Sequence, residues 1–69
     1  MTNSELLRQT IRAKGLKYSF IAQEIGITPY CLRKKIDNEN DFKGREIAAI
    51  SKLLSLTDKE RDTIFFASV

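Results

Sequence analysis

Apolar side chains recur at the three- and four-residue spacing of an α-helix in several segments, and glycine or polar residues separate these segments. The first segment covers residues 4–14, where Leu7 and Ile11 form one inward-facing stripe. At its start, Thr2 and Glu5 have the spacing of a capping box, in which each side chain accepts a hydrogen bond from the other residue's amide. The pattern predicts that the chain begins with an amphipathic helix.

The central part of the chain predicts two short helices joined by a glycine turn. Ile21, Ala22 and Ile25 recur at helical spacing in a helix over residues 19–25. Gly26 follows, and glycine is the usual left-handed cap at a helix end because it has no Cβ. The first of the two helices is therefore expected to end at this glycine.

The second central helix is expected over residues 28–36. Thr28 can accept a hydrogen bond from an amide of the first turn, and Pro29 fits that turn because its missing N–H has no partner there. Leu32 and Ile36 lie four apart and are expected to pack against the preceding helix. The other side of this helix is then left to its aromatic and basic residues.

A polar loop and a fourth helix are expected after the central segment. Residues 37–41 carry three acidic side chains and predict an exposed loop. Phe42 interrupts this polarity and is expected in the core. The fourth helix is entered through residues 43–46 and ends near residue 54. Its apolar stripe consists of Ile47, Ile50, Leu53 and Leu54.

A second capping box at residues 57–60 predicts a fifth helix that ends near Ala67. Phe65 and Phe66 lie side by side in it, and one helix cannot turn two consecutive residues toward one narrow core. Either one ring covers the bundle while the other meets a neighbouring molecule, or the first helix covers both. The first alternative makes a homodimer through the last helix a hypothesis.

These segments predict an all-α fold, a compact bundle of about five helices. A length of 69 residues suffices for one domain, which we expect to span residues 1–69. The content of 42% hydrophobic and 30% charged residues is typical of a globular chain rather than a disordered one.

The chain has one cysteine and no histidine, which excludes an internal disulfide and the usual zinc and Cys–His catalytic arrangements. We therefore expect no cofactor and no metal. No apolar run approaches the ~20 residues of a membrane span, and the first residues lack the pattern of a signal peptide. We expect a cytoplasmic protein that does not contact a membrane.

The net charge of +3 is unevenly distributed along the chain. Residues 1–36 carry seven Lys or Arg and two acidic residues, whereas residues 37–69 carry five and seven. Such asymmetry indicates that one face meets a polyanion. The alternative is that these charges only solvate helix surfaces.

The central segment resembles the helix-turn-helix of small phage-type regulators, the repressor and Cro-like class, and the resemblance covers about residues 5–56. Lys17 and Tyr18 depart from the family, which often has a serine or threonine cap and then a glutamine there. The matching residues are the small Ala22, Gly26 at the turn, Ile27 after it, and the apolar Ile21, Ile25 and Leu32.

The resemblance implies a repressor-like DNA-binding domain in which the helix over about residues 28–36 enters the major groove of double-stranded DNA. Arginine can bind guanine through two hydrogen bonds, and a proline or tyrosine ring can pack on a thymine methyl group. Expected contacts to DNA bases or to a protein partner are Thr28, Pro29, Tyr30, Arg33 and Lys34. Expected phosphate contacts are Lys17, Tyr18, Ser19, Asn38 and Lys43.

Two functions remain open. The first is a sequence-specific transcriptional regulator of a phage lysis–lysogeny switch, which acts as a Cro-like dimer in the bacterial host cell. The second is an antirepressor, similar to the modulators of repression of some Gram-positive phages, which binds a phage repressor and modulates its DNA binding. An enzyme is not expected, because the paired carboxylates Glu39 and Asp41 lie in an exposed loop and no glycine-rich phosphate loop exists.

Overall fold

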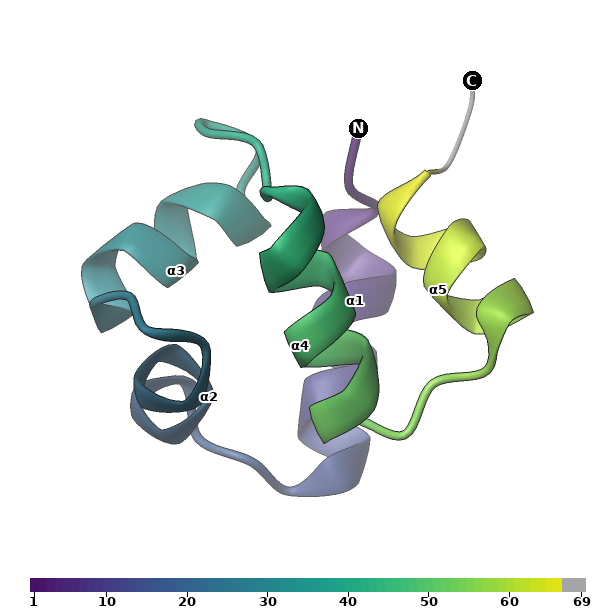
Figure 1. Cartoon of the computed structure of the whole chain (residues 1–69), viewed down its shortest axis with the longest axis horizontal. Coiled ribbons are helices and arrows are strands. Elements are labelled where there is room, and N and C mark those ends of the chain that lie inside the picture. The colour runs from purple at the N-terminus through teal and green to yellow at the C-terminus, as the bar shows by residue number, and fades with distance from the viewer. Residues whose placement is uncertain (67–69) are drawn as a thin grey trace.

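The computed structural model describes residues 1–66, in which the regular structure is five α-helices without a strand. The helices are α1 (Ser4–Lys14), α2 (Tyr18–Ile25), α3 (Pro29–Ile36), α4 (Gly44–Leu53) and α5 (Asp58–Phe65) (Figure 1). The prediction of an all-α fold with about five helices is confirmed. The first helix has its predicted bounds, the second begins one residue earlier, and Ala67, the predicted end of the fifth, lies outside the described residues.

The helices pack around α1 and α4, which lie one in front of the other at the centre of Figure 1. The α2–α3 pair lies to their left in this view and α5 to their right. Within residues 1–66, α2 contacts α3 and α4, α1 contacts α3 and α5, and α4 contacts α5. In contrast, no Cα atom of α3 lies within 8 Å of one in α4, so only side chains can join these two helices.

One cluster of buried apolar side chains holds all five helices together. Burial of a side chain such as leucine or isoleucine contributes about 1.5–3 kcal/mol to the free energy of unfolding. The predicted helix stripes therefore supply most of the core. Its members are Leu7, Ile11, Ile21, Ala22, Ile25, Leu32, Ile36, Ile47, Ile50, Leu54, Ile64 and Phe65.

The start of α1 differs from its prediction. Asn3 caps the helix, and its side chain accepts a hydrogen bond from the Leu6 amide at 3.1 Å, so the capping box predicted from Thr2 and Glu5 was wrong. The reason is a contact with the loop after α3: the Thr2 N–H donates to Asn38 Oδ1 at 3.1 Å, and Asn38 Nδ2 donates to the Thr2 carbonyl at 2.8 Å. Thr2 is therefore buried and joins the N-terminal segment to the loop after α3 instead of capping α1.

The two consecutive phenylalanines have different surroundings. Phe65 is buried, and its ring meets the edge of the half-buried Phe42 with centroids 5.3 Å apart and an angle of 82° between the planes. Phe66 is 57% exposed. The alternative in which the first helix covers both rings is therefore wrong, and Phe65 is not available for a homodimer contact, whereas a contact of Phe66 with a neighbouring molecule stays a prediction. None of the helices in the described part of the chain is long and apolar enough to cross a membrane.

Candidate functional site

The turn between α2 and α3 is fixed by backbone geometry. Gly26 has φ 81° and ψ 30°, which is the left-handed conformation predicted for it. Its N–H donates to the Gln23 carbonyl at 3.3 Å, and the Ile27 N–H donates to the Ala22 carbonyl at 2.9 Å. These two bonds close the end of α2 in a Schellman-type arrangement. The direction in which the chain leaves α2 is thus set before α3 begins.

The start of α3 also agrees with its prediction. Thr28 is the N-cap, and its Oγ1 accepts a hydrogen bond from the Cys31 amide at 3.1 Å. Pro29 occupies the first position of the helix. The lone Cys31 is half-buried.

The two sides of α3 differ sharply in exposure. Leu32 and Ile36 are almost completely buried against the rest of the bundle. Tyr30 is 67% exposed and Arg33 is also exposed, so both project outward as predicted. Lys34 is half-exposed, and its ammonium lies 5.0 Å from the centroid of the Tyr30 ring. Helix α3 therefore presents an aromatic and cationic surface.

The third consecutive cation of α3 has a different role. Lys35 is buried, and its Nζ lies 2.6 Å from Oε1 of the buried Glu46 of α4. The same carboxylate oxygen accepts a hydrogen bond from the Lys43 N–H at 2.9 Å. Because α3 and α4 have no close backbone approach, this ion pair is a direct side-chain link between them.

The electrostatics of Glu46 follow from this arrangement. Burial by itself would raise the pKa of the carboxyl group, because it disfavours the charged form. The hydrogen bonds from Lys35 and from the Lys43 amide, together with the charges of both lysines, outweigh burial and lower the pKa of Glu46 below its usual value. The group is therefore held as a carboxylate, and it compensates the charge of Lys35.

Sequence reasoning missed this pair. Lys35 entered only the charge balance of residues 1–36 and was given no position, although it lies three residues after Leu32 and next to Ile36, on the apolar side of the helix. That spacing was the available signal. No sequence pattern pointed to Glu46 as its partner, because the contact depends on how α3 and α4 are arranged in space.

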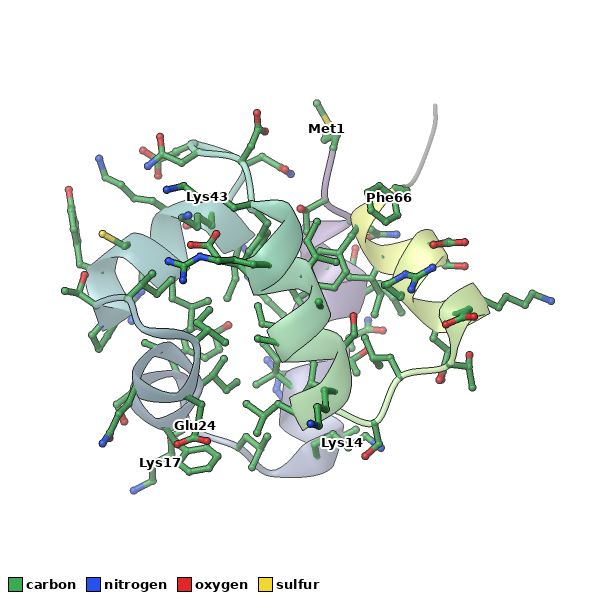
Figure 2. The ribbon with its side chains drawn as sticks, viewed as in Figure 1. Met1, Lys14, Lys17, Glu24, Lys43 and Phe66 are labelled. Carbon is green, nitrogen blue, oxygen red and sulfur yellow. The ribbon has the colours of Figure 1, made fainter. Side chains whose placement is uncertain are left out.

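The predicted phosphate contacts are distributed over three parts of the chain. Lys17 and Lys43 are the exposed N-cap residues of α2 and α4, and the α2–α3 pair lies between them in Figure 2. Ser19 is exposed, whereas Tyr18 is half-buried and packs against the core. Asn38 donates its side-chain amide to the Thr2 carbonyl and to Ser4 Oγ, so its hydrogens are already used.

The Lys and Arg side chains of the described residues differ in whether they have an acidic partner. Within residues 1–66, Arg8 pairs with Asp37, Lys35 with Glu46, and Arg61 with two aspartates of α5. The same part of the chain contains no ion pair for the cations Lys17, Arg33, Lys34 and Lys43. Five more cations also lack an ion pair within residues 1–66, so α3 and its surroundings hold four of the nine unpaired Lys and Arg side chains.

No three His, Cys, Asp or Glu side chains gather as a possible metal site in the described residues. Comparisons of the chain with models of protein families, with curated proteins and with solved structures found no match.

Proposed function

We propose that this chain is a sequence-specific, DNA-binding transcriptional regulator in which α2 and α3 form a helix-turn-helix and α3 enters the major groove. The observation that supports this most is the outward side of α3, where exposed Tyr30 and Arg33 lie beside cations that have no ion pair within residues 1–66. Uncompensated positive charge on a helix of fixed direction is what a polyanionic duplex would bind.

The dimensions of α3 fit this role. An α-helix with its side chains is about 10–12 Å across, and the major groove of B-DNA is about 12 Å wide. Arg33 lies in the second turn, where its guanidinium can donate two hydrogen bonds to O6 and N7 of guanine. Thr28 and Pro29, at the helix start, would lie closest to the base edges.

Backbone contacts would come from the sides of α3. Lys17 and Ser19 lie at the start of α2, and Lys43 lies at the start of α4, so they can reach phosphates on either side of the groove. Lys34 completes this set. The resemblance to small phage regulators makes a lysis–lysogeny switch in a bacterial cytoplasm the setting in which we expect this binding to act.

Salt dependence of duplex binding tests the proposal. Fluorescence anisotropy would follow the purified protein on a labelled duplex carrying the promoter region that adjoins its own gene, at several salt concentrations. About three phosphate contacts predict a slope near −3 in a plot of log K against log salt concentration, because binding releases condensed cations. Lack of salt-sensitive binding at low salt would contradict the proposal.

Arg33→Ala separates specific from general attraction. Loss of a guanine contact should weaken binding to the preferred duplex by about 1–3 kcal/mol while scrambled DNA is bound almost as before. Arg61→Ala removes the same charge from α5, where two aspartates already compensate it, and is the matched control. Equal losses for the two variants would show that net charge rather than α3 determines binding.

A second candidate function is an antirepressor that binds a repressor protein. The observation that favours it is the loop after α3, whose Glu39 N–H donates to the Lys34 carbonyl at 2.9 Å. This bond holds the exposed acidic residues Glu39 and Asp41 near the end of α3, where they would repel phosphate. Binding to a co-encoded repressor, with no affinity for DNA alone, would favour this function.

A homodimer is a further proposal about assembly. Phe66 and Met1, both exposed, border a hollow of about 300 Å³ whose floor includes Phe42 and Phe65. Figure 2 shows both labelled side chains at the end of the molecule where α5 finishes. A dimer through the C-terminal helix would therefore use Phe66 rather than Phe65. Sedimentation of wild-type protein and of Phe66→Ser would test this, since only the wild type should dimerise.

A further inference from the structure

A small hollow lies beside the exposed aromatic ring of α3. Pro29, Tyr30 and Arg33 line this hollow, which has a volume of about 260 Å³. Residues three and four apart are neighbours on a helix, so the three side chains share one side of α3. The hollow thus combines two apolar rings with the guanidinium group, the strongest hydrogen-bond donor of this surface.

The ammonium of Lys34 also lies near the ring of Tyr30. It lies 5.0 Å from the ring centroid, where the cation is attracted to the electrons of the ring face. Lys34 is not among the residues that line the hollow. A ring that is 67% exposed is thereby restrained while part of its apolar surface remains open.

We propose that this hollow receives the 5-methyl group of a thymine that adjoins a guanine bound by Arg33. The inference rests on the proposed function of α3 in the major groove and adds the base step that it reads. Among the four bases only thymine presents a methyl group in that groove, and guanine presents the pair of acceptors that suits arginine. The uncompensated cations around the hollow favour a DNA occupant by charge.

The position of the two groups explains why the bases should be adjacent. Tyr30 and Arg33 are one turn apart on the same side of α3, and both border the same hollow. A methyl group placed against the tyrosine and proline rings therefore lies beside the guanidinium. The base that the guanidinium binds is then the neighbour of the thymine rather than a distant one.

Single-atom changes in DNA test the inference. Duplexes that the protein binds would be selected from a randomised pool, and each thymine would then be replaced in turn by deoxyuridine, which removes only the methyl group. Wild-type protein should lose about fourfold in affinity at one thymine beside a guanine, the value expected for one buried methyl group. Replacing that guanine by 7-deazaguanine should also weaken binding.

Protein variants test whether the Tyr30 ring makes the contact with the methyl group. Tyr30→Ala should bind the selected duplex more weakly and bind the thymine and deoxyuridine forms equally. Tyr30→Phe keeps the ring and should retain the fourfold discrimination. Arg61→Ala changes a residue of α5 that has no part in the proposed contact surface and is the control, which should retain the fourfold discrimination of the wild type. Circular dichroism would compare the helical content of the variants.

The outcomes separate this inference from the proposed function. Selected duplexes without a thymine–guanine step, no deoxyuridine effect at any thymine, or a fourfold loss that persists in Tyr30→Ala would overturn the inference while DNA binding by α3 stands. Loss of discrimination in Tyr30→Phe would also overturn it, because the ring would then not be the contact. Failure to select any duplex would overturn the proposed function with it.

Discussion

Helices α3 and α5 are built alike in their local structure. Each is eight residues long and follows a threonine N-cap. The hydroxyl of Thr28 accepts the Cys31 amide and that of Thr57 accepts the Glu60 amide, both at 3.1 Å. Each helix also turns bulky apolar side chains into the common core. Capping and packing alone therefore do not distinguish them.

Acidic residues outnumber basic residues in α5, and Arg61 is paired within the helix, whereas Lys59 has no ion pair within residues 1–66. Glu60 returns the hydrogen bond of its cap by accepting the Thr57 N–H at 2.8 Å. The Arg61 guanidinium has one nitrogen, Nη1, 3.4 Å from Asp58 Oδ1 and the other, Nη2, 3.1 Å from Asp62 Oδ1. The helix therefore presents little net positive charge to a partner.

Helix α3 has the opposite arrangement. The residue that matches Glu60 in it is Cys31, so no carboxylate covers its first turn. Arg33 and Lys34 have no acidic partner within residues 1–66, and only the inward Lys35 is compensated, by a residue of another helix. Capping and apolar packing fix the position of each helix, whereas the positions of the carboxylates determine which of the two helices can attract an anion.

The largest effect is expected where α3 depends on the buried carboxylate of Glu46 in α4. Glu46→Ala would leave the buried Lys35 charge without a partner, and loss of one member of a buried pair costs about 3–5 kcal/mol in the free energy of unfolding. Urea denaturation would measure the loss. The double variant Lys35→Met/Glu46→Leu is the control and should recover most of the stability. A loss below about 1 kcal/mol in Glu46→Ala, the value of an exposed pair, would contradict the burial of this link.

The turns before the two helices offer the next comparison. Gly26 precedes α3 at φ 81°, and Ser55 precedes α5 at φ 55°, so both chain reversals use the left-handed conformation. That conformation costs a residue with a Cβ roughly 1–2 kcal/mol. Gly26→Ala should therefore lower the free energy of unfolding by this amount, and Ser55→Gly should leave it unchanged or raise it. Thermal denaturation of both variants would measure the difference, and stabilisation by Gly26→Ala would contradict the turn geometry.

Most of the helix pattern could be predicted from the sequence because its signals are local. Gly26 and Pro29 mark the end of α2 and the start of α3 through their own backbone preferences, and the two helices end and begin beside them. The exposed Tyr30 and Arg33 followed from helical periodicity alone.

The remaining features could not be predicted because they depend on distant contacts. The buried pair of Lys35 and Glu46 joins residues of two helices, and the sequence gives no register between them. Asn38 was expected to approach phosphate, but it holds the N-terminal segment, which also displaces the cap of α1 from Thr2 to Asn3. Such contacts are fixed only by the packing of the whole bundle.

A smaller effect is expected from acid. The pKa of Glu46 is lowered in the folded protein, so between the folded and the unfolded pKa the unfolded chain binds more protons. The stability from this group is therefore complete at neutral pH and is lost as pH falls through the folded pKa. Melting temperatures recorded from neutral to acidic pH should fall more steeply for the wild type than for Lys35→Met/Glu46→Leu. Parallel curves would contradict this contribution.

The smallest effect is expected in α5. Arg61→Ala breaks ion pairs whose aspartate side chains are 94% and 57% exposed, and exposed pairs contribute about 0–1 kcal/mol. Denaturation midpoints of the variant and the wild type should nearly coincide. A loss as large as that of Glu46→Ala would mean that α5 is held by its charges in the way that α3 is.

The most direct test of the difference between α3 and α5 is a nuclear magnetic resonance titration of ¹⁵N-labelled protein with the selected duplex at moderate salt. The largest amide shifts should fall on α3 around Tyr30, Arg33 and Lys34, with smaller shifts at the starts of α2 and α4 and almost none in α5. Shifts concentrated on α5, or no shifts with any duplex, would contradict this prediction.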